Sequence, residues 1–155
     1  METTPIKVLF LDIDGVLNGN GFIAKRHCDE RVNKLPHPLD YFDPDCVERL
    51  NKIIEETNAK IVISSDWKFT LGLNDIFRKV GIRTEIYDKT PYRFGLRHEE
   101  IHEWLENHNV EKYVILDDIP FQNFEYEGEN FIQTDSQYGL TDKDVVKIID
   151  VFNKS

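Results

Sequence analysis

Three short, almost entirely apolar segments constrain the fold of this chain more than any other feature of its sequence. They are IKVLFL (6–11), KIVISS (60–65) and YVILDD (113–118). Each is rich in β-branched residues, which predicts strands that are buried on both faces of a sheet. Segments with helical spacing separate them, and this alternation is typical of an α/β fold with a mostly parallel central sheet. We therefore predict a Rossmann-like three-layer sandwich.

The remaining elements are predicted from capping residues and from the spacing of apolar side chains. Asp43 followed by a proline predicts the start of a helix, Gly81 predicts the end of another, and Thr141 caps the last one. The expected helices cover 45–56, 74–80, 97–108 and 142–152, and two weaker strands cover 83–88 and 130–135. Residues 19–43 have no clean period and are expected to form loops, with a small hairpin as an option. Because no linker or repeat divides the chain, residues 1–155 are expected to form one domain.

The charge balance disfavours several classes of partner. The chain has 29 acidic and 19 basic residues, a formal net charge of −10. This charge disfavours non-specific binding to duplex nucleic acid but allows a local basic pocket for one phosphate. No segment approaches the ~18 apolar residues that a membrane span needs, so no membrane partner is expected. Two cysteines, Cys28 and Cys46, do not make a disulfide framework, and a reduced, cytoplasmic setting is expected.

Each of the three apolar segments ends in side chains that can carry chemistry. In chain order these are Asp12 and Asp14, Ser64 and Ser65, and Asp117 and Asp118. Because ligands of open α/β sheets bind outside the carboxyl ends of the strands, we expect all six to gather at one edge. Four converging carboxylates would repel one another, and a hard divalent cation with oxygen ligands removes that conflict. The pattern therefore predicts a Mg²⁺ site next to a phosphate.

Such a site could transfer a phosphoryl group. One carboxylate can attack phosphorus while the metal neutralises charge on the nucleophile and on the phosphoryl oxygens. A second acid two residues later lies on the same side of an extended segment, where it can protonate the leaving oxygen and then activate water. A hydroxyl at the end of the second strand would hold a phosphoryl oxygen. The cation that balances the developing charge would be Arg97, at a predicted helix start.

The residues at these strand ends resemble the four sequence motifs of the haloacid dehalogenase (HAD) superfamily, in their usual order. The motifs are carried by VLFLDIDGVLN, IVISS, Arg97 and VILDD. More narrowly, SSDWK, GLRHEEIHEWL, YVILDD and a late GLT resemble the phosphatase-like HAD domain of multifunctional RNA-repair proteins, over nearly the whole chain. The resemblance implies a Mg²⁺-dependent phosphatase.

The resemblance also implies a role for each motif residue. Asp12 would be the nucleophile that forms an aspartyl-phosphate, and Asp14 the general acid and base, with its backbone carbonyl on the metal. Ser64 would bind the phosphoryl group, and Ser65 is the neighbour that could replace it. The implied Mg²⁺ ligands are Asp12, Asp14, Asp117 and Asp118.

Two features of the superfamily bear on the rest of the site. Many members use lysine as the cationic residue, so Lys89 and Arg93 are alternatives to Arg97. Substrate choice often lies in a cap domain inserted after the first or second motif, but the gaps 15–60 and 66–97 each already hold a predicted helix. Neither gap has room for a full cap domain. We therefore expect a nearly open site that takes a bulky or polymeric phosphoester, or a partner that closes it.

The substrate is expected to contact residues around these motifs. Trp67 and Lys68 follow the second motif, where an aromatic ring beside a cation could stack a base and hold a phosphate. The alternative is that Trp67 packs under the loop. With Gly15 and Ser65 they make up the predicted substrate-binding set. The substrate would be a nucleic-acid end, a nucleotide or a small phosphorylated metabolite; a non-catalytic phosphate-binding or regulatory module is the alternative from a different class.

One further motif competes with this interpretation. HEEIH (98–102) matches the H-E-x-x-H pattern of zinc hydrolases, and His98 and His102 share one face of the predicted helix. The apolar stripe of that helix, with Ile101 and Trp104, is rotated away from the histidine pair. We therefore interpret HEEIH as a solvated helix face rather than as a zinc-hydrolase centre.

Overall fold

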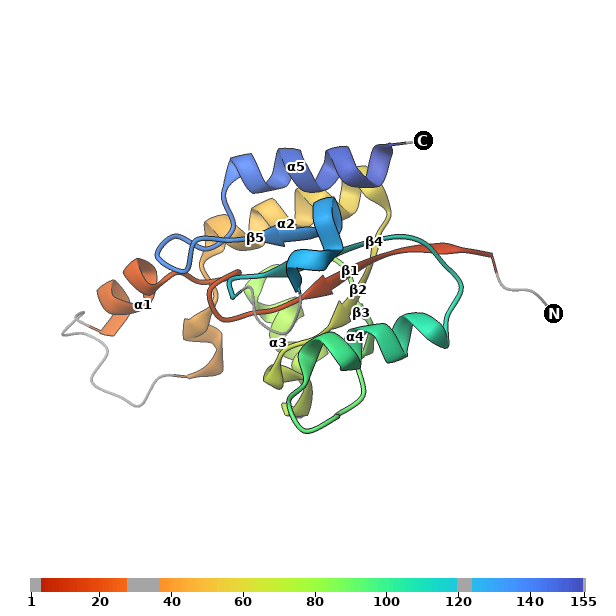
Figure 1. Ribbon diagram of the computed structural model, residues 1–155. Coiled ribbons are helices and arrows are strands. Elements are labelled where there is room, and N and C mark those ends of the chain that lie inside the picture. Colours follow the sequence, from red (N-terminus) through yellow and green to blue (C-terminus); the bar gives the residue numbers. More distant parts are fainter. Residues whose placement is uncertain (1–3, 28–36, 120–123, 155) are drawn as a thin grey trace.

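A five-stranded, entirely parallel sheet forms the centre of the computed structural model, which describes residues 4–27, 37–119 and 124–154 (Figure 1). The strands lie in the order β3-β2-β1-β4-β5. Their bounds are β1 Ile6–Leu11, β2 Lys60–Ile63, β3 Ile86–Lys89, β4 Val110–Asp117 and β5 Phe131–Gln133. The three apolar segments of the sequence are the three inner strands, where burial on both faces favours apolar side chains.

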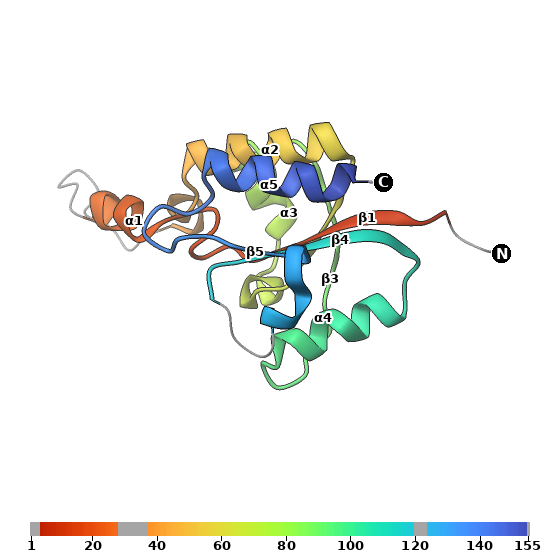
Figure 2. The ribbon, with the colours of Figure 1, turned by 45° about the horizontal axis from the view of Figure 1, so that its top comes forward.

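Helices cover both faces of this sheet and complete the three-layer α/β sandwich that the sequence predicts (Figure 2). The helices α2, α3 and α5 pack against one face, and α4 packs against the other. The helix bounds are α1 Asn20–His27, α2 Pro44–Thr57, α3 Leu73–Val80, α4 Arg97–Glu106 and α5 Asp142–Asn153. The 3₁₀ segments are η1 Pro38–Tyr41, η2 Asp66–Phe69 and η3 Phe124–Asn130. As predicted, the side chains of Asp43 and Thr141 cap α2 and α5, and Gly81 ends α3.

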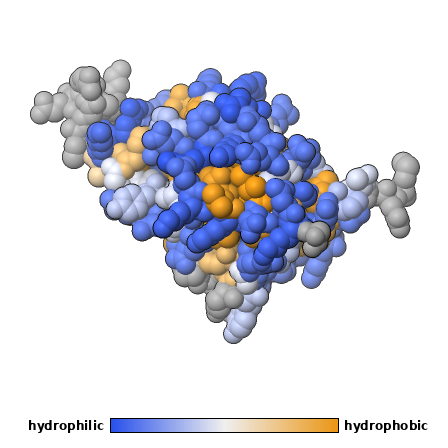
Figure 3. Space-filling view, turned by 90° about the horizontal axis from the view of Figure 1, so that it is seen from above, coloured by the Kyte–Doolittle hydropathy of each residue, from blue (hydrophilic) through white to orange (hydrophobic). Residues whose placement is uncertain are grey.

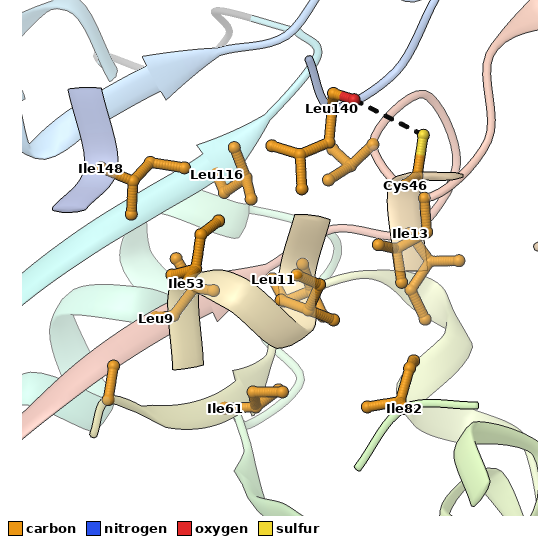
Figure 4. Packing of buried hydrophobic residues seen from close by; sticks show 14 of the residues in the cluster. Leu9, Leu11, Ile13, Cys46, Ile53, Ile61, Ile82, Leu116, Leu140 and Ile148 are labelled. Carbon is orange, nitrogen blue, oxygen red and sulfur yellow. Dashed lines mark hydrogen bonds between the residues drawn. The ribbon is translucent and has the colours of Figure 1, made fainter. Parts of the chain in front are cut away.

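The sheet divides the core into two apolar clusters, because successive side chains of a strand point to opposite faces. Leu9 and Leu11 of β1 belong to the larger cluster, with α2, α3 and α5. Val8 and Phe10 belong to the smaller cluster, with α4. Figure 4 shows Leu9 and Leu11 in the larger cluster, close to Ile53 of α2. These last four side chains of β1 are completely buried, so the groups that follow this strand stand on a rigid base.

The pairing register brings the ends of the three inner strands level with one another. Leu11, the last residue of β1, pairs with the last residue of β2 on one side and with Leu116 of β4 on the other. The next residues along the three strands, Asp12, Ser64 and Asp117, therefore lie side by side. The chain runs outward from β1 through β2 to β3 and returns to β4 on the other side of β1. Open α/β sheets bind their ligands where the strand order reverses in this way.

The segment between β1 and α2 differs from its prediction. Instead of a hairpin, the described residues of 19–43 form α1 and η1. α1 lacks a clear apolar stripe, and contacts with a distant segment hold it. The N–H of Asn20 donates to the carbonyl of Ser136, and a Cβ on Gly19 would lie 2.3 Å from the carbonyl oxygen of Gln137. Tertiary contacts of this kind leave no periodic signal in the sequence.

Other expected boundaries shift by a few residues, because apolar spacing does not mark where a strand or helix ends. β3 and β5 are the clearest cases, at Ile86–Lys89 and Phe131–Gln133 instead of 83–88 and 130–135. In the described part of the chain, the insert after β1 contains α1 and η1, and the segment between β2 and α4 contains η2, α3 and β3. Neither forms a cap domain in these described residues.

The cysteine that the structure describes is an inert thiol. Cys28 lies outside the described residues. Cys46 of α2 is buried, and its Sγ lies 3.6 Å from the carbonyl oxygen of Leu140 (Figure 4). Burial raises the pKa of this thiol to about 11, so it stays protonated at neutral pH.

The outer surface of α2 and α5 is mostly hydrophilic, with one apolar area near the middle of the view in Figure 3. Val146 of α5 is 67% exposed. Among the described residues, we find no helix that combines the length and the hydropathy required to cross a bilayer.

Candidate active site

Three carboxylates from two neighbouring strands meet at the carboxyl edge of the sheet. Asp12 follows β1, Asp117 ends β4 and Asp118 comes next, and one oxygen of each lies within 4.8 Å of the others. Asp117 is completely buried, Asp12 is 5% exposed and Asp118 is half-buried. The sequence predicts this gathering, and the register of β1 and β4 explains it.

Arg97, the first residue of α4, brings a guanidinium to two of these carboxylates. Its Nη1 lies 2.6 Å from Oδ2 of Asp117 and 3.5 Å from Oδ1 of Asp12. Burial and the charge of Asp117 nevertheless raise the pKa of Asp12 to about 9, and burial also raises the pKa of Asp118. One positive charge does not offset three carboxylates in a buried site, so the group favours a further cation.

The three carboxylates form a donor set that suits Mg²⁺. All their donor atoms are oxygens, and Mg²⁺ prefers one or two carboxylates together with waters or phosphate oxygens. A cavity of about 180 Å³ adjoins the group and could admit those remaining ligands. It is lined by Asp12, Asp14, Ser65, Asp66, Trp67, Arg97, Asp118 and Ile119.

Asp14 borders the same cavity but is not one of the three grouped carboxylates. Its side chain is exposed and held by two hydrogen bonds. Nδ2 of Asn18 donates to its Oδ1 at 3.3 Å, and Nε1 of Trp67 donates to its Oδ2 at 3.1 Å. These bonds orient the carboxylate without burying it. Ligation of a metal through its backbone carbonyl stays a prediction.

Gly15 allows a close approach within the protein, and its expected contact with the substrate stays a prediction. Its φ is +81°, a left-handed conformation, and a Cβ there would lie 2.2 Å from Oδ2 of Asp118. Its N–H donates to Oδ1 of Asn18 at 3.0 Å, and its carbonyl accepts from Oγ1 of Thr134 at 2.7 Å. A side chain at this position would therefore displace Asp118 from the carboxylate group.

The two serines after β2 differ in their hydrogen bonds. The buried Oγ of Ser64 has no partner among the described residues, whereas Oγ of Ser65 accepts from the N–H of Trp67 at 3.2 Å. A buried hydroxyl without a partner costs about 1–3 kcal/mol, which makes this Oγ a candidate to donate to a ligand atom. Ser65 lines the cavity, so both serines stay candidates, and the unpaired hydroxyl favours Ser64.

Trp67 packs under its loop, which is the alternative that we gave to base stacking. Its side chain also borders the cavity. Its ring meets Phe42 and Tyr41 edge-to-face, with centroids 5.5 and 6.1 Å apart. Together with its hydrogen bond to Asp14, this packing makes Trp67 a residue that positions the carboxylate.

Lys68 lies in the interior, so the expected phosphate contact is wrong. Its Nζ lies 3.1 Å from Oε1 of Glu100, and the two side chains are only 2% and 4% exposed. The same ammonium donates to Oγ1 of Thr90 and to the carbonyl of Pro91. A buried ammonium needs such partners to offset its desolvation. These contacts tie η2 to α4, whose first residue is Arg97.

The two alternatives to Arg97, Lys89 and Arg93, contact groups outside the acid site. Nζ of Lys89 is 3.5 Å from the carbonyl oxygen of Lys68, and the guanidinium of Arg93 pairs with Glu103. In the described part of the chain, Arg97 is the one of these three cations that contacts the grouped acids.

Three supporting residues were not predicted from the sequence. Thr134 follows β5 and lies level with Asp118, so a search for hydroxyls at every strand end could have found it. Asn18 carries only a weak signal, an amide side chain in a glycine-containing turn. Glu100 carries no sequence signal, because its partner Lys68 lies on η2, 32 residues earlier in the chain.

The raised pKa of Asp12 gives the metal-free protein a defined pH dependence. Because the folded-state pKa of about 9 lies above the ordinary 3.8, Asp12 holds its proton in the folded state. Its contribution to stability is complete below pH ~4 and is lost as the pH rises toward ~9. We expect this group to lower the free energy of unfolding by up to about 1.4 kcal/mol per pH unit in that window.

Urea unfolding at several pH values between ~4 and ~9, in buffer treated with a chelator, measures how the free energy of unfolding changes with pH. We expect a shallower slope for Asp12→Asn, and equal slopes for the two proteins would contradict the assignment. Substitution of the exposed Asp75 by asparagine is the matched control and should leave the slope unchanged.

The buried pair of Lys68 and Glu100 predicts a large loss of stability when one partner is removed. Lys68→Met leaves the Glu100 carboxylate buried without its cation, with the backbone N–H of Arg93 still donating to Oε2, and we expect the free energy of unfolding to fall by about 3–5 kcal/mol. Replacing both residues, as Lys68→Met with Glu100→Leu, should recover most of this loss. Lys79→Met, at an exposed lysine of α3, should change stability by no more than about 0.5 kcal/mol. Chemical denaturation measures the free energy of unfolding of each variant. If Lys68→Met is as stable as Lys79→Met, the buried pair does not stabilise the fold.

Comparison with known families places the chain in one of them. The family of HAD domains in Swiss Army Knife RNA repair proteins matches residues 8–145, a span that contains Asp12, Asp117 and Arg97. No curated protein and no solved structure matches the chain. Since the family match covers most of the sequence and the fold is the α/β layout of that family, the chain belongs to the HAD domain family of Swiss Army Knife RNA repair proteins.

Proposed function

We propose that this protein is a Mg²⁺-dependent phosphatase that removes a phosphate from the end of a single-stranded nucleic acid, with Asp12 as nucleophile. The observation that carries the proposal is the group of Asp12, Asp117 and Asp118, whose oxygens lie within 4.8 Å beside Arg97. Membership of a HAD domain family supports the phosphatase class. The exposed position of Asp14 supports a division of labour between two acids on one strand end.

In the first half-reaction, a carboxylate oxygen of Asp12 attacks phosphorus. The bond from phosphorus to the leaving oxygen breaks, and Asp14 gives a proton to that oxygen. In the second half-reaction, Asp14 takes a proton from a water molecule whose oxygen attacks phosphorus, and inorganic phosphate leaves as the bond to Asp12 breaks. Asp14 suits both steps because it borders the cavity while staying in contact with solvent.

The remaining residues would bind the phosphoryl group and balance its charge. Mg²⁺, held by Asp12, Asp117 and Asp118, would neutralise the charge of nucleophile and phosphate. Arg97 provides a fixed positive charge at the same edge, and the unpaired hydroxyl of Ser64 can donate to a phosphoryl oxygen.

The size of the cavity indicates where the body of the substrate lies. At about 180 Å³ the cavity is smaller than the ~300 Å³ at which pockets for drug-sized ligands begin, so the rest of a larger substrate must lie outside it. Three exposed aromatic residues, which we call the aromatic cluster, lie at the end of η2 or just before α4. They are Phe69, Tyr92 and Phe94, exposed by 58, 54 and 86%.

The aromatic cluster has the features of a stacking surface. The ring centroids of Phe69 and Tyr92 lie 5.8 Å apart, as do those of Tyr92 and Phe94. Phe94 has a φ of +56°, a left-handed conformation that costs an aromatic residue about 1–2 kcal/mol, and its ring is largely exposed. Base–aromatic stacking tolerates any base sequence, because every base has a π-face, so exposed rings of this kind suit the bases of a single strand.

The nucleophile is tested with a chromogenic phosphate ester and Mg²⁺. We expect the parent protein to release phosphate and Asp12→Asn to lose roughly 10³-fold or more in kcat, because no other group replaces the nucleophile. Asp75→Asn, at an exposed carboxylate of α3, should keep the parent rate. Circular dichroism and chemical denaturation check that both variants fold. Full activity of a folded Asp12→Asn, or a parent that binds phosphate without turning over any ester, would refute the proposal.

The aromatic cluster is tested by comparing two substrates. Stacking is worth ~1–3 kcal/mol per base, so Tyr92→Ala and Phe94→Ala should lower kcat/KM about 5- to 150-fold for a single-stranded oligonucleotide with a 3′-phosphate. The same variants should leave kcat/KM for the small chromogenic ester unchanged. Tyr126→Ala removes an aromatic ring of η3 that is 80% exposed and should affect neither substrate. Equal losses on both substrates, or a parent that prefers sugar phosphates, would favour a small-metabolite phosphatase.

A further inference from the structure

Two histidines and a glutamate converge on the face of α4 that the phosphatase mechanism does not use. His98 and His102 lie one turn apart on this helix, with ring centroids 4.4 Å apart. Glu127 reaches them from η3, and its Oε1 lies 2.9 Å from Nε2 of His98 and also contacts Nε2 of His102. One donor atom of each of the three side chains lies within 4.8 Å of the others.

This arrangement changes the interpretation of HEEIH as a solvated face. The side chains of His98 and His102 are only 23% and 39% exposed, and that of Glu127 is 7% exposed. Sequence spacing alone indicates the two histidines, whereas the third donor comes from a segment 25 residues further along the chain. Two imidazoles and one carboxylate are a ligand set that zinc takes in proteins.

The surroundings of Glu127 hold it ready for this role. The hydroxyl of Tyr113 donates to its second carboxylate oxygen, Oε2, at 2.5 Å. Hydrogen bonds of this kind orient ligating carboxylates from the second layer of a metal site. On the other side, the ring of His98 packs against Phe124, with centroids 5.9 Å apart. Oε1 is thereby aimed at the two imidazoles.

The geometry requires only a small adjustment to admit a metal. Tetrahedral zinc with bonds of about 2.0–2.1 Å places its ligand atoms roughly 3.3 Å apart. The separation of 2.9 Å between Nε2 of His98 and Oε1 of Glu127 is a hydrogen-bond distance, so these atoms would move apart by a few tenths of an ångström. Nε2 of His102 lies closer to Oε1 and would have to move further. Rotation of the partly exposed imidazoles can supply this movement while Tyr113 keeps the carboxylate in place.

We propose that His98, His102 and Glu127 bind one Zn²⁺ ion, with water at the fourth position. None of the three belongs to the acid group at the strand ends, so the inference does not depend on the proposed phosphatase activity. The ion would fasten η3, which follows β4, to the first turns of α4. Since α4 begins at Arg97, zinc would stabilise the same end of the helix that faces the acids.

The proposal is tested by titrating the full chain with Zn²⁺, and in parallel with Co²⁺, in the presence of millimolar Mg²⁺. We expect one Zn²⁺ per chain, a higher thermal unfolding temperature with zinc, and the visible d–d absorption of tetrahedral Co²⁺. His102→Gln and Glu127→Gln should each weaken zinc binding at least tenfold. His108→Gln, at a histidine that stacks on Trp104 near the end of α4, is the matched control and should bind like the parent.

Two further measurements separate this site from the acids and from misfolding. Asp12→Asn should keep the zinc affinity of the parent, and circular dichroism of each metal-free variant should match the parent. If the histidine or glutamate variant unfolds, His98→Gln, which removes the remaining ligand, replaces it. No bound zinc in the folded parent, or equal affinity in the parent and in a folded His102→Gln, would overturn the proposal. Loss of binding in Asp12→Asn alone would assign the ion to the acids and overturn it as well.

Discussion

The close approach of two buried carboxylates, Asp12 and Asp117, is the constraint on which the rest of the structure depends. Asp12 follows the buried strand β1 and Asp117 ends the buried strand β4, so neither can turn into water. Their repulsion has to be relieved by a proton, which the raised pKa of Asp12 indicates, or by positive charge. Arg97 meets part of it, which requires α4 to begin at this edge of the sheet. The buried pair of Lys68 and Glu100 then holds the first turn of α4 against η2. These ion pairs, together with the apolar packing of Ile101 and Trp104, hold the start of α4 at this edge of the sheet.

The central sheet could be predicted because the information for it is local. Each inner strand is a short apolar run, and the helices between the runs require parallel pairing. The meeting of Asp12 and Asp117 follows as well, since each comes one residue after a paired apolar residue of neighbouring strands. Arg97 could be predicted because it begins a helix whose apolar residues, Ile101 and Trp104, have clear helical spacing.

Contacts between segments that are distant in the chain could not be predicted in this way. Spacing shows which residues share a face of one element, but not which two loops touch. Lys68 illustrates the limit: it follows a strand like any exposed lysine, and the carboxylate that allows its burial lies 32 residues away in Glu100. Gly15 is similar, because the atom that excludes a side chain there belongs to Asp118. α1 is held by a distant turn and has no apolar stripe that would indicate it.

The first turns of α4 explain why one stretch of sequence supports two interpretations. Successive residues of a helix point about 100° apart, so a helix enclosed by protein on several sides presents a different residue to each neighbour. These neighbours are the acids for Arg97, η3 for His98, η2 for Glu100 and the core for Ile101. HEEIH therefore overlaps a phosphatase motif without conflict, because the two sets of side chains lie on different faces. A polar helix face indicates exposure to solvent only when no other segment covers it. Here η3 covers that face of α4.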